Sequence, residues 1–325
     1  MIAFLYPGQG AQQAGMLAAL PDSAAVRSTL DEATELIGSI RDLDAAESLT
    51  FTTNAQLALL FCGVATARAL TDEHGVRPDV VAGHSAGAFA AAVGAGVLTF
   101  AEAVAAVRVR GDAMARACGA GRWGMAALTG LRLREVRDLV DSTASGDELW
   151  IANVNAADQV VLGGTITALN SARQAAQSAG ARRFALLDVA VASHGPCQSD
   201  TARAVAQQLS AVPRRQLRAV YMTNVGARRV RDDSAAVLDD LATAVVHPVR
   251  WFDIVRMLPE LGVTATVEMP PGDVLSRLVS ATTTSLHVFN VTENGVGSIS
   301  ARLRSPLFGA IPQRDHRVED LLGPT

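Results

Sequence analysis

The stretch GHSAGAF, at residues 83–89, places Ser85 between two glycines at the junction of two hydrophobic patterns. The preceding residues 79–83 form a short apolar run that predicts a buried strand, and residues 86–97 are alanine-rich and predict a helix. A G-x-S-x-G sequence at a strand-to-helix junction is typical of a nucleophile elbow, a tight turn that needs small neighbours and presents the serine hydroxyl at the carboxyl edge of a sheet. The same pattern also arises by chance in glycine-rich bends. The stretch therefore makes Ser85 a candidate nucleophile.

Backbone N–H groups on two segments are candidates for an oxyanion hole. The N–H of Ala86 follows the candidate nucleophile at the start of the predicted helix, where the helix dipole adds positive potential. The sequence PGQG, at residues 7–10, ends the first predicted strand at 2–6. The N–H of Gln9 is therefore expected at the same carboxyl edge, where α/β folds bind ligands. An ordinary tight turn explains PGQG equally well.

Apolar strands alternate with helices on both sides of this stretch, along most of the chain. This alternation predicts an α/β fold, hydrolase-like, with a mostly parallel sheet covered by helices on both faces. Strands are expected at 2–6, 79–83, 218–225 and 265–269, and helices at 23–37, 54–70, 86–97, 101–117, 198–210, 233–245, 247–258 and 270–279.

Residues 121–190 have a different pattern, strand–helix–strand–strand–helix–strand, which is typical of a small ferredoxin-like α+β domain. We therefore expect a discontinuous large domain, at 1–120 and 191–300, that carries this insertion. Residues 301–325 lose periodicity and are predicted to form a tail.

Composition narrows the class of protein. The 325 residues are 49% hydrophobic, enough for a large core, and carry a net charge of -4. All 28 basic residues are arginine, with no basic tract, so a nucleic-acid partner is not expected, and a side chain that holds an anion must be Arg or His. The longest apolar run, around 89–101, is too short for a membrane span, and the N-terminus predicts a strand rather than a signal peptide.

The three cysteines, Cys62, Cys118 and Cys197, are far apart in the sequence and lack metal-ligand spacing. They predict reduced thiols in a cytoplasmic protein, and no metal site is expected.

A nucleophilic serine needs a base, and His194 is the best candidate among six histidines. It follows the last strand of the predicted insertion, at a domain junction where clefts form. His84 is expected on the other side of the turn in a structural role, and His247 precedes Pro248, where it could cap a helix. The remaining histidines suit surface or packing positions: His74, His287 and His316.

Arg110 lies on an apolar helical face, in register with Val107 and Met114. A buried charge needs a partner, which is either a carboxylate inside the fold or the carboxylate of a substrate held by the guanidinium fork.

Together these stretches resemble the malonyl-CoA:acyl-carrier-protein transacylases and related acyltransferase domains. The resemblance runs from residue 3 to about 290, on segments that include FLYPGQGAQ, AQLALL, GHSAGAFAAAVGAGVL, RGDAMARA, IANVNAADQVVLGG, VASH, HPVRW and VEMPPGDVL. It implies that malonyl-CoA is the acyl donor, that an acyl carrier protein with a phosphopantetheine-type arm is the partner, and that no cofactor is permanently bound.

The resemblance also assigns roles to residues. It implies that Ser85 is acylated, that His194 is the base, and that Arg110 holds the malonyl carboxylate. The N–H groups of Gln9 and Ala86 would form the oxyanion hole. Three supporting residues follow from it: a backbone carbonyl near Ala244 that orients the histidine, Gln56 near the pocket, and His247 at a position where Asn is usual.

Departures from the family pattern suggest a subtype. Ala88 stands where a glutamate is usual in fatty-acid-synthesis members, and GPG is replaced by PPG at 270–272. The chain looks most like the acyltransferase (epsilon) subunit of malonate decarboxylase, which would add other subunits of that enzyme as partners. The alternative is a transacylase of fatty-acid or polyketide synthesis. Small residues at Ala192 and Ser193 leave methylmalonyl as an alternative to malonyl.

Two other classes compete with the transferase. A serine hydrolase or thioesterase would need an acid between serine and histidine, for which Asp188 is the candidate. A non-catalytic acyl-CoA or carrier-binding module would not need Ser85, His194 and Arg110 intact.

Overall fold

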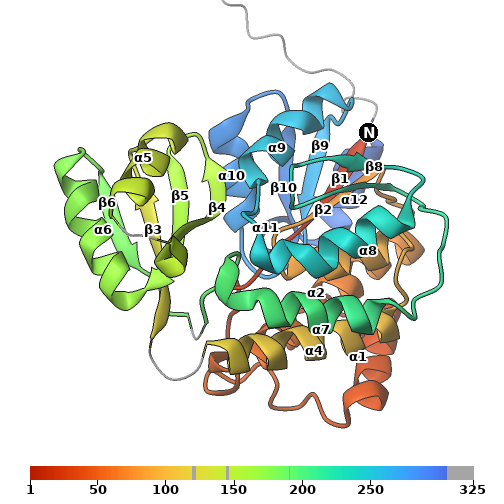
Figure 1. Cartoon of the computed structure of the whole chain (residues 1–325). Coiled ribbons are helices and arrows are strands. Elements are labelled where there is room, and N and C mark those ends of the chain that lie inside the picture. Colours follow the sequence, from red (N-terminus) through yellow and green to blue (C-terminus); the bar gives the residue numbers. More distant parts are fainter. Residues whose placement is uncertain (119–121, 144–145, 190, 306–325) are drawn as a thin grey trace, which may run out of the picture.

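The computed structural model describes residues 1–118, 122–143, 146–189 and 191–305, which form two separate sheets (Figure 1). The large sheet has six strands in the order β10-β9-β1-β2-β7-β8, all parallel except β8, which pairs antiparallel with β7. The mostly parallel α/β sheet predicted from the sequence is therefore confirmed. Its strands are β1 (Ile2–Tyr6), β2 (Val80–Gly83), β7 (Val220–Met222), β8 (Arg229–Val230), β9 (Ala265–Glu268) and β10 (His287–Asn290).

Helices cover both faces of the large sheet because its central strands alternate their apolar side chains between two cores. Phe4 and Tyr6 of β1 pack into one core, and Ala3 and Leu5 pack into the other. The first core is formed with α1 (Ala24–Ile37), α2 (Thr52–Arg68), α3 (Gly87–Gly94), α4 (Phe100–Ala117), α7 (Ser199–Leu209), α8 (Ser234–Thr243), α11 (Val291–Asn294) and α12 (Val296–Arg304). The second is formed with α9 (Trp251–Glu260) and α10 (Val274–Thr282).

The small sheet is antiparallel, in the order β4-β5-β3-β6, and lies beside the large one in Figure 1. Its strands are β3 (Trp123–Thr129), β4 (Leu149–Ala156), β5 (Gln159–Thr165) and β6 (Arg183–Leu186). Two helices connect them, α5 (Leu133–Thr143) between β3 and β4 and α6 (Ile166–Ser178) between β5 and β6. This order and topology are those of a ferredoxin-like unit. Backbone hydrogen bonds join it to the segment before α9, since Val154 N donates to Val249 O at 2.8 Å and Val249 N donates to Ala152 O at 2.9 Å. The predicted domain boundaries stay a prediction.

The C-terminal end departs from the sequence-based expectation. Helix α12 continues to Arg304, so residues 301–304 are helical and not part of a tail, because Ile299 and Ser300 anchor the helix in the core. Residues 306–325 of the predicted tail lie outside the described residues. The helix expected from residue 247 begins only at Trp251, because residues 247–250 run alongside β4 first.

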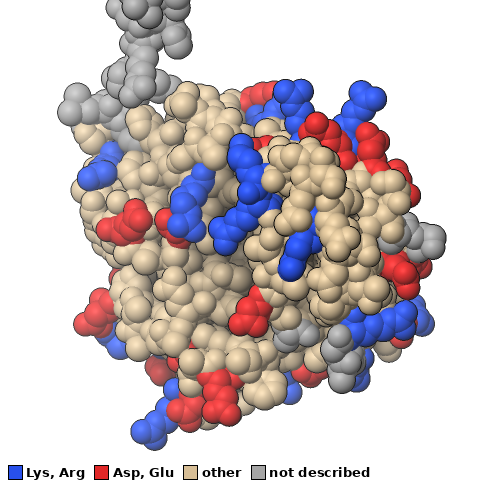
Figure 2. Space-filling view, turned by 90° about the vertical axis from the view of Figure 1, so that its left-hand side faces the viewer, with Lys and Arg blue, Asp and Glu red and all other residues tan. Residues whose placement is uncertain are grey.

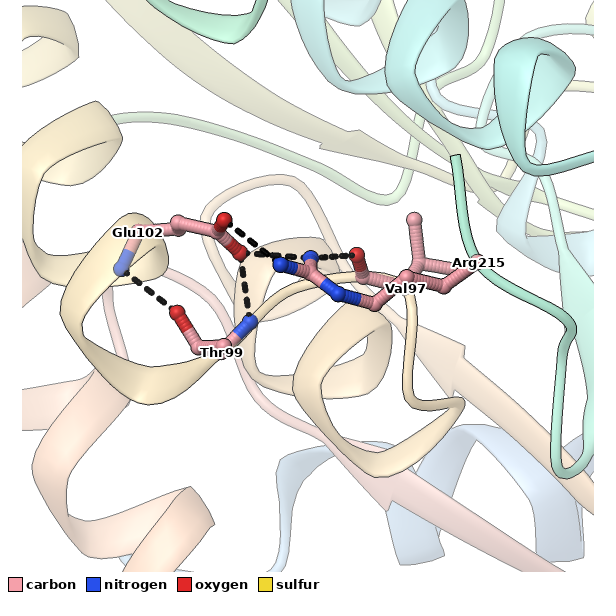
Figure 3. A network of polar contacts seen from close by, with 4 residues as sticks. All are labelled: Val97, Thr99, Glu102 and Arg215. Carbon is pink, nitrogen blue, oxygen red and sulfur yellow. Dashed lines mark hydrogen bonds and ion pairs between the residues drawn. The ribbon is translucent and has the colours of Figure 1, made fainter. Parts of the chain in front are cut away.

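An ion pair holds the start of α4, the helix that carries Arg110 (Figure 3). Thr99 and Glu102 form a capping box, in which each side chain bonds the other residue's backbone N–H. Arg215 donates to both carboxylate oxygens of Glu102, at 2.7 and 2.8 Å, and to Val97 O at 2.8 Å. Arg215 holds the pKa of Glu102 below its usual range. The segment before β7 is thereby joined to the start of α4.

The surface carries charges of both signs. Every blue side chain in Figure 2 is arginine because the sequence has no lysine. Many of them lie in the upper half of the face shown and others at its lower right and lower edge, interspersed with acidic side chains. Among the described residues, no helix combines the length and the hydropathy that a bilayer crossing demands.

Candidate active site

Ser85 lies in a sharp turn between β2 and α3, with a left-handed backbone φ of 52°. A left-handed conformation is rare for a residue with a Cβ and persists where surrounding packing enforces it. The two flanking glycines allow the turn to pack closely. A Cβ on Gly83 would lie 2.2 Å from the backbone of Gly87, and a Cβ on Gly87 would lie 2.2 Å from Tyr6 O. Strand, turn and helix are therefore packed too tightly for any larger residue, as a nucleophile elbow requires.

His194 meets Ser85 from the segment that follows the small sheet. Its Nε2 lies 2.7 Å from Ser85 Oγ. Its Nδ1 lies 2.6 Å from Ala244 O, in the short helix η5 (Ala244–Val246), and 3.1 Å from His247 O. Because carbonyl oxygens only accept hydrogen bonds, Nδ1 carries the proton, and Nε2 is left to accept from the serine hydroxyl.

The environment of His194 favours the neutral imidazole. Burial, with a further contribution from the nearby Arg110 charge, lowers the pKa of His194 from 6.5 to about 3. The carbonyl of Ala244 acts in the opposite direction but does not outweigh burial. The imidazole is thus a free base at neutral pH and can take the proton of the Ser85 hydroxyl.

Arg110 points from α4 to the same serine. Its side chain is only 3% exposed, and burial lowers its pKa to about 10. Nη2 donates to Ser85 Oγ at 3.1 Å, and Nη1 donates to Gln56 Oε1 at 2.5 Å. Within the described residues Arg110 forms no ion pair with a carboxylate, so the alternative of an ion pair inside the fold does not hold there. A buried, unpaired guanidinium next to the nucleophile suits an anionic substrate group.

Gln56 and Gln9 belong to one polar network. Gln9 Oε1 accepts from Thr52 Oγ1 at 2.8 Å and from Gln56 Nε2 at 3.3 Å. Across residues 1–118, 122–143, 146–189 and 191–305, neither the Gln9 N–H nor the Ala86 N–H donates to another protein group. Two unpaired amide donors on the segments after β1 and β2 match the predicted position of an oxyanion hole.

Other candidates lie apart from this cluster. His84 Nε2 lies 3.0 Å from Asn155 Oδ1, and its ring packs against Trp251, so it does not reach Ser85 Oγ. The His247 side chain is exposed, and only its carbonyl contacts His194. His247 caps the C-terminal end of η5, where its N–H donates to Ala244 O at 3.3 Å, and α9 begins only at Trp251.

The acid that a hydrolase would need is not in place. Asp188 is exposed, and within the described part of the chain the hydrogen-bond partners of His194 Nδ1 are carbonyls only. His74 and His287 are absent from the site, and His316 lies outside the described residues. A cavity of about 280 Å³ opens beside His194, lined by groups that include Trp150, Pro196 and Pro248.

Two thiols that are distant in sequence meet next to the site. Cys118 Sγ lies 3.3 Å from Ala192 O, and Cys197 Sγ lies 4.0 Å from the same oxygen. Gln198 Nε2 also donates to Cys118 Sγ at 3.2 Å and to Ala192 O at 2.6 Å. Both cysteines are free thiols, as expected, although folding brings them together.

Sequence reasoning missed two asparagines, Asn155 and Asn224. Asn155 binds His84, and Asn224 Oδ1 accepts from Ser85 N at 2.9 Å. Asn224 could have been found from its place in the sequence, because it comes just after β7, at the same carboxyl edge of the sheet where Ser85 comes just after β2.

Comparison with known proteins places this geometry in a family. The family described as acyl transferase domain matches residues 3–301. The malonyl CoA-acyl carrier protein transacylase of Bacillus subtilis (strain 168) is 35% identical over 299 residues, which are 90% of this chain and 93% of the relative.

Solved structures agree with that match. The malonyl CoA-acyl carrier protein transacylase (fabD) from Coxiella burnetii has a TM-score of 0.89 at 30% identity, covering 94% of this chain and 98% of that one. A malonyl-transacylase solved in complex with its type II PKS acyl-carrier protein has a TM-score of 0.87 at 31% identity, covering 92% and 98%. The chain therefore belongs to the acyl transferase domain family and is an acyltransferase enzyme.

Proposed function

We propose that this enzyme transfers a malonyl group from malonyl-CoA to the thiol of an acyl carrier protein through a malonyl ester of Ser85. The observation that carries the proposal is the convergence of His194 Nε2 and Arg110 Nη2 on Ser85 Oγ, at 2.7 and 3.1 Å. The names of the relatives, which are malonyl CoA-acyl carrier protein transacylases, support the same reaction.

In the first step Ser85 Oγ attacks the thioester carbonyl while His194 Nε2 takes the hydroxyl proton. The tetrahedral intermediate collapses, the carbon–sulfur bond breaks, and the proton passes from Nε2 to the leaving CoA thiolate. The second step is the reverse with a carrier thiol: His194 takes the thiol proton, the sulfur attacks the ester, and Ser85 recovers its hydroxyl.

The unpaired N–H groups of Gln9 and Ala86 would stabilise the oxyanion in both steps. Donors that are fixed before the reaction stabilise a developing negative charge without reorganisation. The Gln9 and Ala86 N–H groups lie in the turns after β1 and β2, at the carboxyl edge of the large sheet. The carbonyl oxygen of the bound thioester or ester would therefore point towards that edge.

Arg110 would select the acyl group. The malonyl ester ends in a carboxylate a short chain away from Oγ, within reach of a guanidinium that already touches Oγ. An acetyl group would leave this buried charge without an anion, which is costly. Malonyl is therefore expected over acetyl.

The pathway is a finer question. The relatives reported above are transacylases, so they favour fatty-acid or polyketide synthesis over the malonate decarboxylase subunit that the sequence departures suggested. The discriminating test is the acceptor: malonyl transfer to a carrier with a phosphopantetheine arm, against transfer to one with a dephospho-CoA-derived arm.

The main experiment is intact-protein mass spectrometry after brief incubation with equal amounts of malonyl-, methylmalonyl- and acetyl-CoA. We expect one malonyl group on the wild type, none on Ser85→Ala, and reduced selectivity for Arg110→Ala. A dominant methylmalonyl adduct would overturn the malonyl assignment and reflect the small Ala192 and Ser193.

The other classes give distinct results. Free CoA without an adduct would indicate a hydrolase, since water would then remove the acyl group from Ser85. Neither adduct nor free CoA from any donor would contradict acyl transfer and leave a binding module.

A further inference from the structure

Asn224 makes two hydrogen bonds to the nucleophile turn from its side chain. Its Oδ1 accepts from Ser85 N at 2.9 Å, and its Nδ2 donates to Gly83 O at 3.0 Å. The residue is fully buried. These bonds hold the residues on both sides of His84, the pair that must bend sharply to give Ser85 its left-handed φ of 52°.

The pattern reproduces a rung of the parallel sheet. Strands β2 and β7 pair in the register Val80↔Val220, Val81↔Tyr221 and Ala82↔Met222. Two steps further along this register, Asn224 is opposite His84. In a parallel ladder the residue opposite position 84 donates to the carbonyl of 83 and accepts from the N–H of 85. The Asn224 side chain makes these same two bonds in place of its backbone.

The Asn224 backbone is engaged elsewhere. Its N–H donates to Asp240 Oδ2 at 3.0 Å, and its carbonyl accepts from Arg250 N at 3.0 Å. Asp240, on α8, also accepts from Val225 N at 2.9 Å and from Tyr221 Oη at 3.1 Å. The backbone of Asn224 therefore no longer pairs with β2, and its side-chain carboxamide makes the next two hydrogen bonds to the β2 segment instead.

We propose that Asn224 is a positioning residue. Its carboxamide fixes the nucleophile turn by making the two hydrogen bonds to Ser85 N and Gly83 O that a backbone residue of β7 would otherwise make. Without it, the Ser85 N–H and the Gly83 carbonyl lose their partners at the point of greatest backbone bending, and buried unpaired groups favour rearrangement of the turn. Ser85 Oγ then loses its alignment with His194 Nε2. Among the described residues, Asn224 does not line the cavity beside His194 and forms no hydrogen bond with Arg110, so we expect binding of the CoA portion to be unaffected.

Three variants test this role. Asn224→Ala removes both bonds. Asn224→Asp keeps the acceptor for Ser85 N–H but sets a carboxylate oxygen against Gly83 O, unless the acid is protonated and its O–H donates to that carbonyl. Asn290→Ala is the matched control. Asn290 is also buried, and its side chain accepts from Glu293 N and donates to Glu293 Oε2 at the end of β10, the edge strand on the other side of the sheet.

Two readouts separate positioning from folding. The first is labelling of Ser85 by a fluorophosphonate, which reports the reactivity of the nucleophile whatever acyl group the enzyme uses. The second is the single-turnover rate of Ser85 acylation by malonyl-CoA, measured together with the dissociation constant of CoA. Thermal unfolding sets a temperature at which every variant is folded.

We expect Asn224→Ala to slow both reactions of Ser85 by about 100-fold, the scale of a misplacement of about 1 Å, with CoA affinity unchanged. The Asn290→Ala variant should lose stability and keep both rates. Asn224→Asp should recover relative to the wild type as pH falls, because protonation restores the donor to Gly83 O.

Wild-type rates in folded Asn224→Ala would overturn the proposal, as would an equal loss of rate in Asn290→Ala. If Asn224→Ala does not fold, the test is the pH dependence of the two Ser85 reaction rates in Asn224→Asp. Rates that keep a constant ratio to those of the wild type as pH falls would contradict the positioning role of Asn224. The inference rests on Ser85 being the nucleophile of the proposed function. A wild type that is labelled by the fluorophosphonate but not by malonyl-CoA would contradict the malonyl assignment alone.

Discussion

Ser85 and His194 both have left-handed backbones, with φ of 52° and 59°, and their side chains meet at 2.7 Å. Ser85 lies in the turn between β2 and α3, and His194 lies between the small sheet and α7. Both conformations are costly for a residue with a Cβ. Two strained turns from distant parts of the chain thus converge on one hydrogen bond, and the surrounding packing holds them there.

Removal of the guanidinium should affect malonyl transfer selectively. We expect Arg110→Ala to slow Ser85 acylation by malonyl-CoA about 10- to 100-fold, the effect of losing a charged hydrogen bond worth ~1.5–3 kcal/mol. Acylation by acetyl-CoA should change little, because acetyl offers no carboxylate. Stopped-flow or quenched single-turnover assays measure both rates. Arg108→Ala is the control, since Arg108 is exposed on the same helix; equal losses in the two variants would contradict the assignment.

The acid limb of the pH profile should lie far below the usual histidine range. Because the pKa of His194 is lowered from 6.5 to about 3, the imidazole stays neutral and able to accept a proton as pH falls from 8 to 5. The second-order rate of acylation by malonyl-CoA, which reports the free enzyme, should therefore stay level across this range. CoA binding measured over the same range removes any contribution from affinity. A fall in rate centred near pH 6.5 would show that His194 titrates as an ordinary imidazole.

Close packing at the elbow predicts a severe effect of one methyl group. A Cβ on Gly87 would lie 2.2 Å from Tyr6 O, so Gly87→Ala must displace α3 or β1. We expect a loss of stability on the order of 3 kcal/mol or more, measured by urea unfolding. The control is Gly297→Ala in α12, where a Cβ meets no atom within 4 Å and helix propensity should add about 0.5–1 kcal/mol. Comparable stabilities of the two variants would refute the packing argument.

Glu268 should make the fold less stable as pH rises. Burial raises the pKa of Glu268 from 4.5 to about 7, although its carboxylate accepts from Leu275 N and Ser276 N at the start of α10. The folded protein then binds the proton more tightly than the unfolded chain, so this contribution is present below pH 4.5 and is lost towards pH 7.

The matching variant is Glu268→Gln, which cannot ionise. The difference in free energy of unfolding, variant minus wild type, should increase by about 1–3 kcal/mol between pH 5 and 7.5, because the wild type loses stability over this range and the variant does not. Glu35→Gln, at an exposed position, is the control. A pH-independent difference for Glu268→Gln would mean that the carboxylate is charged in the folded protein throughout.

Most of the architecture followed from local pattern. Apolar runs at 2–6, 79–83 and 265–269 predicted strands of the large sheet, and all three are found there. The order of elements in 121–190 predicted the small antiparallel sheet. Arg110 was identified because one face of its helix is apolar and the residue lies on it, which is a property of the sequence alone.

Other features depend on contacts that no local pattern encodes. Asn224 is recognisable only once the β2–β7 register is known, because its function is to continue that register by a side chain. Helix α12 reaches Arg304, where the sequence predicted a tail from residue 301, because Ile299 packs into a core formed by distant segments. The proximity of Cys118 to Cys197 likewise arises from folding of two segments onto the Ala192 carbonyl.

The partner of His194 Nδ1 has a genetic consequence. In a site that depends on an acidic side chain, a single codon change deletes the group that orients the base. Here the acceptor is the carbonyl of Ala244, and every amino acid supplies a carbonyl at that position. Missense variants can displace this oxygen by moving α8 or η5, but none can remove it. A saturation library at position 244 should therefore be governed by side-chain volume, with small residues tolerated whatever their chemistry.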